Sequence, residues 1–241
     1  MDGYSWEELT PGVRVCVSRE HRFGTDAFLL ADFAAPRRKD MACDLCSGCG
    51  IIPLLWFREE GPRQVWAVEI QPEAAKQLSL SVEESGLAGR VIPLQADLRA
   101  LPDAVPKGVF DLVACNPPYQ AAGGGILSEA LSDRIARHEV LCRVEDVCRT
   151  AAGLLRFGGR LCLCQRPERL ADVVCAMREA GIEPKTLRFV QKREDTAPWL
   201  FLIEGKKGAK PFLRTLPPLI IQGEGGFSRE LLRIYRKEQN L

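Results

Sequence analysis

The sequence predicts an α/β fold in which helices cover both faces of a mostly parallel, doubly wound sheet. Short apolar runs alternate with longer segments of helical character, and glycine or proline separates the two kinds. Strands that alternate with helices in this way pair in parallel through right-handed crossovers. The last two expected strands are joined by a polar loop alone and form a closing pair. The expected strands are residues 40–45, 64–70, 91–95, 109–115, 160–164, 186–191 and 199–204.

Local signals mark the helices between these strands. Gly48 and Gly50 break the chain after the first strand, and a helical segment follows. Pro72 stands at a helix start, where its missing N–H costs nothing. The pair Gly158-Gly159 and the single Gly181 each end a helix. The expected helices are residues 25–35, 51–60, 73–86, 144–155 and 167–180.

The composition is typical of a soluble protein. The chain has 241 residues, of which 46% are hydrophobic and 27% charged, a length that suits one α/β domain with additions. It contains no run of eighteen apolar residues and begins with no secretory signal, so we expect no membrane span and a cytoplasmic location. Most of the ten cysteines lie in apolar runs, which favours free thiols in a reducing compartment.

The net charge of +1 hides an asymmetry along the chain. From Lys185 to the end there are 12 basic and 6 acidic residues, whereas the preceding part has a balance of −5. A basic C-terminal third indicates a polyanionic partner, and an unevenly charged solvated surface explains the same counts equally well.

The stretch Asn116-Pro117-Pro118-Tyr119 is the most informative motif. It follows an apolar run that ends at Cys115, so it lies where a buried strand of an open α/β sheet meets its ligand crevice. Two prolines make the turn stiff and hold an amide and an aromatic ring in fixed relation. An amide oxygen, a proline carbonyl and a stacking ring can grip a planar group that carries an NH2. Adenine, cytosine and a glutamine amide all fit.

A second constellation follows the first three strands. Asp44, Cys46, Gly48 and Gly50 lie in the loop after the first strand, where glycines let a ligand approach the backbone. Glu69 ends the second strand 19 residues after Gly50, a spacing at which an acid can accept both hydroxyls of a nucleoside ribose. After the third strand, Asp97 can accept a hydrogen bond from an adenine amine. The loop lacks the complete dinucleotide fingerprint and the lysine of a phosphate-binding loop.

Together, these motifs resemble those of class I S-adenosylmethionine-dependent methyltransferases. The resemblance implies a Rossmann-like, seven-stranded sheet with one antiparallel strand. It also implies S-adenosyl-L-methionine as cofactor, S-adenosyl-L-homocysteine as product, and Asn116, Pro117, Pro118 and Tyr119 as the catalytic motif. The cofactor contacts that we expect are Thr25, Asp26, Asp44, Cys46, Gly48, Gly50, Glu69, Ile70, Asp97, Leu98 and Asn116. For Thr25 and Asp26, a direct cofactor contact and a role in shaping the substrate entrance both stay open.

The resemblance narrows to bacterial tRNA1(Val) adenine-N6 methyltransferases, which modify the adenine just 3′ of the anticodon. The motif of residues 23–30 before the glycine loop carries it, together with later segments at 136–139, 166–170, 183–185 and 217–220. It implies tRNA as partner, with RNA contacts expected at Arg137, His138, Lys192 and Arg193. We expect three segments, which are an N-terminal segment (1–40), a cofactor-binding catalytic domain (41–205) and a basic extension packed on that domain (206–241).

Other readings stay open. The Asn-Pro-Pro-Tyr motif also fits glutamine-N5 methylation of a protein such as a translation release factor, although only about forty residues precede the glycine loop. DNA adenine methylation usually needs a separate recognition domain, which we do not expect. A non-catalytic RNA-binding protein with the same fold is a further alternative. Cys43, Cys46 and Cys49 have iron–sulfur-like spacing, but Cys43 belongs to a buried strand and we expect no metal.

Overall fold

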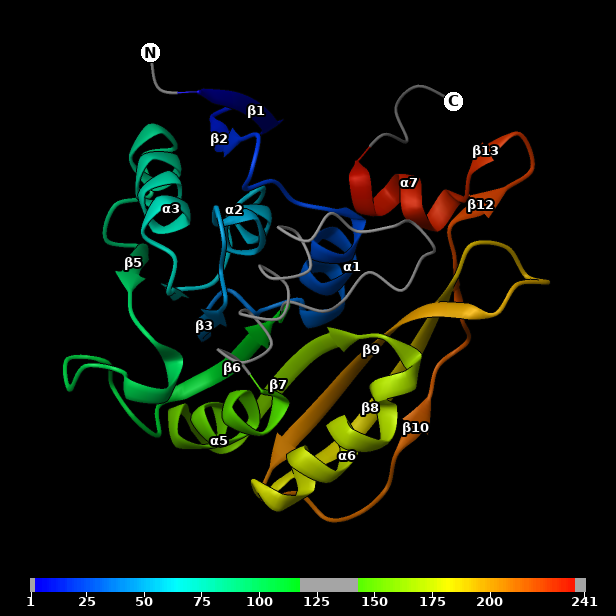
Figure 1. Cartoon of the computed structure of the whole chain (residues 1–241). Helices are drawn as coiled ribbons and strands as arrows, with labels where there is room; N and C mark the ends of the chain where they lie inside the picture. The colour runs from blue at the N-terminus through cyan, green and yellow to red at the C-terminus, as the bar shows by residue number, and fades with distance from the viewer. Residues whose placement is uncertain (1–2, 118–142, 237–241) are drawn as a thin grey trace, which may run out of the picture.

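The computed structural model describes residues 3–117 and 143–236 of the chain. These residues form three layers, with a central sheet between two layers of helices (Figure 1). The expected strands are β3 (Met41–Leu45), β4 (Gln64–Glu69), β5 (Val91–Gln95), β6 (Phe110–Cys115), β7 (Leu155–Gln165), β8 (Ile182–Gln191) and β9 (Pro198–Lys207).

The sheet has the predicted doubly wound, mostly parallel topology. These strands lie in the order β5-β4-β3-β6-β7-β9-β8, with parallel pairing from β5 through β7. Strand β9 runs antiparallel to both of its neighbours, so the prediction of one antiparallel strand is confirmed. Within the described residues the sheet reaches nine strands, because β10 (Arg214–Thr215) and β11 (Leu219–Ile220) pair with β8 at its edge.

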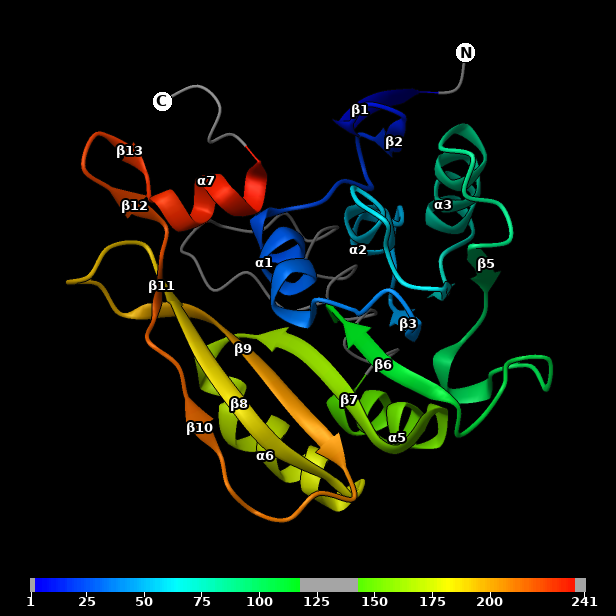
Figure 2. The same cartoon turned by 180° about the vertical axis from the view of Figure 1, so that it is seen from behind.

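Helices cover both faces because the central strands are apolar on both sides. One face packs against α1 (Thr25–Ala34), α2 (Ile51–Trp56), α3 (Pro72–Glu84) and α7 (Arg229–Tyr235). The other packs against α5 (Val144–Leu154) and α6 (Leu170–Glu179), which lie next to each other in the lower half of Figures 1 and 2. Alternation along β7 places Cys162 and Cys164 in the first core and Leu161 and Leu163 in the second, as the period of a strand requires.

Several element boundaries differ from the prediction, and β8, for example, begins at Ile182, four residues early. Helix α2 ends at Trp56, four residues early, and the chain turns before β4. Strand β7 begins at Leu155, directly after α5, and runs through the two glycines that we expected to end the helix. A Cβ at Gly159 would lie 2.7 Å from the Phe110 carbonyl oxygen, so a glycine here permits the close approach of β6, where the pairing register shifts.

Both ends of the chain contain elements that the sequence did not predict. At the N-terminus, β1 (Tyr4–Thr10) and β2 (Val13–Ser18) form an antiparallel hairpin on α3, where the Cys16 N–H donates to Ser81 Oγ at 2.9 Å. At the C-terminus, a small hairpin of β12 (Gln222–Gly223) and β13 (Gly226–Phe227) leads into α7. Helix α7 rests on α1, and Arg233 binds Asp32 through two bonds of 2.9 Å.

The nine cysteines within the described ranges are all free thiols. None of the helices in these ranges combines the length and the apolarity that crossing a bilayer requires.

The three-segment division stays a prediction, and Leu231 in α7 provides its test. This side chain is fully buried in the same core as α1 and α2, so Leu231→Ala should lower the free energy of unfolding by about 2–5 kcal/mol. Leu213→Ala is the matched control, because Leu213 is 43% exposed and should cost less than about 0.5 kcal/mol. The measurement is urea unfolding. An unchanged midpoint in Leu231→Ala would mean that the C-terminal extension is not part of the cooperative domain.

Candidate active site

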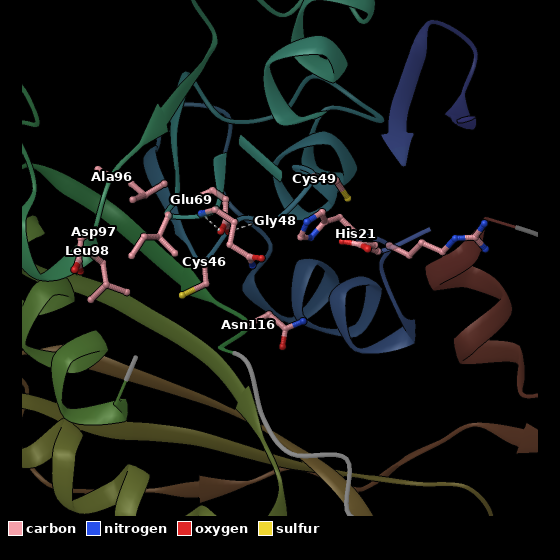
Figure 3. A pocket seen from close by; sticks show the side chains of 14 residues that line it. His21, Cys46, Gly48, Cys49, Glu69, Ala96, Asp97, Leu98 and Asn116 are labelled. Atoms are coloured by element: carbon pink, nitrogen blue, oxygen red, sulfur yellow. Dashed lines mark hydrogen bonds between the residues drawn. The ribbon is translucent and has the colours of Figure 1, made fainter. Parts of the chain in front are cut away.

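The carboxyl ends of four parallel strands converge on one cavity. In the sheet, β6, β3, β4 and β5 are neighbours, and the order reverses at β3, which places the crevice of a doubly wound sheet here. A cavity of about 230 Å³ opens at this edge. Figure 3 shows Asp97 at one end and His21 at the other, with Gly48 and Glu69 between them and Asn116 below. The predicted residues that line it are Cys46, Gly48, Glu69, Ile70, Asp97, Leu98 and Asn116.

The loop after β3 has an unusual backbone. Cys46, Gly48 and Gly50 all adopt left-handed conformations, with φ of 59°, 56° and 89°. A Cβ at Gly48 would meet no atom within 4 Å, whereas one at Gly50 would lie 2.5 Å from Leu78 Cδ1. Gly50 is thus required for packing on α3, and Gly48 leaves open space beside the cavity wall. A left-handed non-glycine residue such as Cys46 stores strain, as functional loops often do.

Glu69 ties this loop to the end of β4. The residue is 4% exposed, and its carboxylate accepts one backbone N–H on each oxygen, from Gly48 and from Gln71, both at 2.8 Å. The two bonds fix the carboxylate at the cavity wall, where each oxygen keeps a further lone pair for a ligand hydroxyl.

Asp97 caps the short 3₁₀ helix η1 (Leu98–Ala100) that follows β5. Its carboxylate accepts from the Arg99 N–H at 2.9 Å and pairs with the Arg99 guanidinium at 2.6 Å. The hydrogen bond with the Arg99 side chain lowers the pKa of Asp97, so the group stays an anion and a hydrogen-bond acceptor at neutral pH.

Asp44 lies fully buried beneath the glycine loop and does not line the cavity. Burial raises its pKa to about 8, against the opposing effect of the bond that Ser47 Oγ donates to Oδ2 at 2.6 Å. Among the described residues, its Oδ1 has no hydrogen-bond partner.

Asn116 follows β6 directly and is half-buried at the cavity. Its Nδ2 donates to Asp26 Oδ2 at 2.9 Å, and its Oδ1 accepts from the Cys164 thiol at 3.0 Å. Two of the expected cofactor contacts, Thr25 and Asp26, do not line the cavity. Asp26 contacts Asn116, and the Thr25 hydroxyl accepts from Tyr235 Oη at 2.7 Å.

A wall of the cavity comes from the loop between β2 and α1, which sequence reasoning missed. The residues that line the cavity but were not predicted as site residues are Glu20, His21, Arg22, Cys49, Val68, Gln71 and Ala96. Gln77, fully buried on α3, holds this loop by donating to the carbonyl oxygens of Cys16 and His21 at 3.1 and 3.4 Å. Such tertiary contacts leave no periodic signal in the sequence.

Several predicted residues cannot be placed at the cavity. Pro118, Tyr119, Arg137 and His138 lie outside the described residues. Arg193 lies in the loop after β8 and pairs with Asp195 at 3.1 Å; neither it nor Lys192 lines the cavity. In residues 3–117 and 143–236, no three His, Cys, Asp or Glu side chains form a group that could hold a metal ion.

Comparisons with known proteins agree with this geometry. The family model described as methyltransferase small domain matches residues 17–169. The chain belongs to the methyltransferase small-domain family. It is thus an S-adenosylmethionine-dependent methyltransferase, and the predicted class is confirmed.

Individual relatives of this methyltransferase refine the comparison. A tRNA1(Val) (adenine(37)-N6)-methyltransferase of Parabacteroides distasonis is 27% identical over 76% of each chain. A ribosomal protein uL3 glutamine methyltransferase of Bordetella pertussis is 32% identical over 46% of this chain and 42% of that protein. A crystal structure from Agrobacterium tumefaciens, described as a predicted O-methyltransferase, has a TM-score of 0.70 at 24% identity and covers 88% and 95% of the two chains. At that identity the match supports the fold.

Asp44 makes the stability of the methyltransferase depend on pH. Its folded-state pKa of about 8 exceeds the usual 3.8, so between these values the folded protein binds a proton that the unfolded chain has lost. From this group alone, the free energy of unfolding falls by up to about 1.4 kcal/mol per pH unit from about pH 4 to 8. Asp44→Asn should remove this slope and be the more stable protein at about pH 8.5.

Urea unfolding of the cofactor-free protein at several pH values measures this effect. Asp103→Asn is the control, since the Asp103 side chain is fully exposed and should leave the pH dependence as in the wild type. Identical pH profiles for wild type and Asp44→Asn would show that Asp44 is ionised normally in the folded protein.

Proposed function

We propose that this methyltransferase modifies N6 of an adenine in RNA, and that its substrate is tRNA1(Val) at the adenine next to the anticodon. The extent of similarity carries this proposal. Adenine-N6 methyltransferase relatives match most of both chains, up to 88% of this one, whereas the glutamine methyltransferase match covers less than half of each. Asn116, the first residue of the Asn-Pro-Pro-Tyr motif, lines the cavity, and the motif is consistent with an amino-group acceptor.

The residues around the cavity fit S-adenosylmethionine. The Glu69 carboxylate suits the ribose hydroxyls and the Asp97 carboxylate suits the adenine amine, and both residues line the cavity. The open space at Gly48 leaves room for a ligand against the backbone. When bound, the cofactor supplies an activated methyl group on a sulfonium.

The protein's task is then to orient the acceptor nitrogen. The amine of adenine is a poor nucleophile because its lone pair is delocalised into the ring. Asn116 Oδ1 and the Pro117 carbonyl oxygen would accept its two hydrogens and draw the nitrogen toward tetrahedral geometry. Tyr119 would stack on the base, an interaction worth about 1–3 kcal/mol. An anticodon loop lowers the cost of unstacking the base, because the target adenine is not in a duplex.

Glutamine-N5 methylation is the second candidate. The Bordetella pertussis relative favours it, and a glutamine amide presents the same planar NH2 to Asn116. The two candidates differ in the methylated product, so a single labelling experiment separates them.

The cofactor assignment predicts the behaviour of Asp97→Ala. Loss of a hydrogen bond to a charged acceptor costs about 1.5–3 kcal/mol, so the dissociation constant of S-adenosylhomocysteine should rise about 10-fold to 100-fold. Asp103→Ala removes an exposed carboxylate from the same stretch and should leave the affinity unchanged. Isothermal titration calorimetry measures both. Equal affinities for wild type and Asp97→Ala would remove Asp97 from the cofactor site.

The central test transfers label from S-adenosylmethionine to unmodified total tRNA, followed by digestion and identification of the nucleoside. We expect labelled N6-methyladenosine with the wild type. With Asn116→Ala the label should be lost, while cofactor affinity stays within a few fold. Label in a protein fraction as methylglutamine would replace the proposal with the glutamine candidate. Near-normal turnover by Asn116→Ala would contradict the role of this residue.

A further inference from the structure

The Asn116 side chain is held at both ends by residues from two other elements. Asp26, at the start of α1, accepts from Nδ2 at 2.9 Å. Cys164, near the end of β7, donates its thiol hydrogen to Oδ1 at 3.0 Å. Helix α1 packs on β6, β7 and β9, so the three residues meet where the helix lies on the sheet.

The chemistry of the two partners determines which way the amide points. A carboxylate oxygen can only accept, so the atom that faces Asp26 must be the amide nitrogen. The Cys164 side chain is fully buried, and burial raises its pKa well above the usual value, so the neutral thiol can donate. The contact with Asp26 therefore sets the orientation, and the thiol donor matches it. A flipped amide would lose the bond to Asp26 and place Nδ2 against sulfur, which is only a weak acceptor.

Asp26 is itself positioned by its surroundings. It is the second residue of α1, where the helix N-terminus favours a carboxylate. A Cβ at Gly24 would lie 2.6 Å from Asp26 Oδ1, so glycine at that position leaves room for the carboxylate to fold back. The preceding Thr25 is anchored by the hydrogen bond from Tyr235 of α7.

We propose that Asp26 and Cys164 are positioning residues that set the orientation and the acceptor strength of Asn116. With one lone pair of Oδ1 bound to the thiol, the other stays available for the hydrogen of the acceptor amine. The negative charge of the Asp26 carboxylate, which lies next to Nδ2, polarises the amide and strengthens Oδ1 as a hydrogen-bond acceptor. This inference deepens the proposed function and rests on it for the role of Asn116.

The Cys164 contact predicts a graded series of variants. Cys164→Ala removes the donor and should lower kcat about tenfold, since small misplacements of a reacting group are costly, while cofactor affinity stays within about twofold. Cys164→Ser keeps a donor and should recover most of the rate. Cys162→Ala is the matched control, because Cys162 is an equally buried thiol on the same face of β7 and should keep near-normal kcat. Equal kcat values for Cys164→Ala, Cys164→Ser and Cys162→Ala would overturn the role of Cys164.

Asp26→Ala separates positioning from cofactor binding. A positioning role predicts a loss of kcat of about tenfold or more at saturating cofactor, with the cofactor dissociation constant within a few fold of wild type. Asp32→Ala is the control, because Asp32 is another aspartate of α1 whose partner is Arg233. A weakened cofactor affinity with normal kcat at saturation would make Asp26 a cofactor ligand and overturn the proposal for it.

A spectroscopic readout keeps this inference separable from the choice of substrate. In ¹⁵N-resolved NMR spectra, the side-chain NH2 of Asn116 is assigned by its loss in Asn116→Ala. Slow hydrogen exchange of this group in the wild type, lost in Asp26→Ala but kept in Cys162→Ala, would support the bond to Asp26. Fast exchange in the wild type would overturn that bond. Absence of tRNA methylation with that bond intact would refute the proposed substrate alone.

Discussion

Parallel pairing of β3 with both β4 and β6 is the constraint on which the site depends. Because parallel strands end at the same edge of a sheet, this pairing brings the glycine loop, Glu69, Asp97 and Asn116 to one cavity from four separate stretches of the sequence. Glu69 then links two of these stretches through its bonds to the Gly48 and Gln71 backbones. The glycine loop and the end of β4 are thereby held as one unit, against which a ligand meets fixed groups rather than mobile ones.

Much of this arrangement was predictable, because it depends on periodicity and on residues with special backbone preferences. Apolar runs located the seven long strands, and the motifs that follow four of them located seven of the residues that line the cavity. The C-terminal hairpin and α7 were missed, since strands of two residues and a helix of seven carry little local signal. The N-terminal hairpin, whose strands have seven and six residues, was missed as well. The loop of Glu20, His21 and Arg22 was missed for a different reason. It reaches the cavity through the buried Gln77, and a contact between residues 56 positions apart cannot be read from spacing.

The position of Asn116 shows how the outer parts of the fold contribute to the site. Helix α7 contacts α1 through Tyr235, the start of α1 carries Asp26, and Asp26 binds the amide. A thiol on β7 that sequence periodicity assigns only to the core also contacts the same side chain. Packing and site chemistry thus share residues, and variants at these positions need readouts of both stability and turnover.

A crystal structure with S-adenosylhomocysteine and an anticodon stem-loop would test the account most directly. We predict that the cofactor product lies in the cavity over β3, β4 and β5, and that the target adenine N6 lies within hydrogen-bond distance of Asn116 Oδ1 and the Pro117 carbonyl. The bond between Asn116 and Asp26 should persist in that complex. An adenine amine placed away from Asn116, or a cofactor bound outside this cavity, would contradict the account.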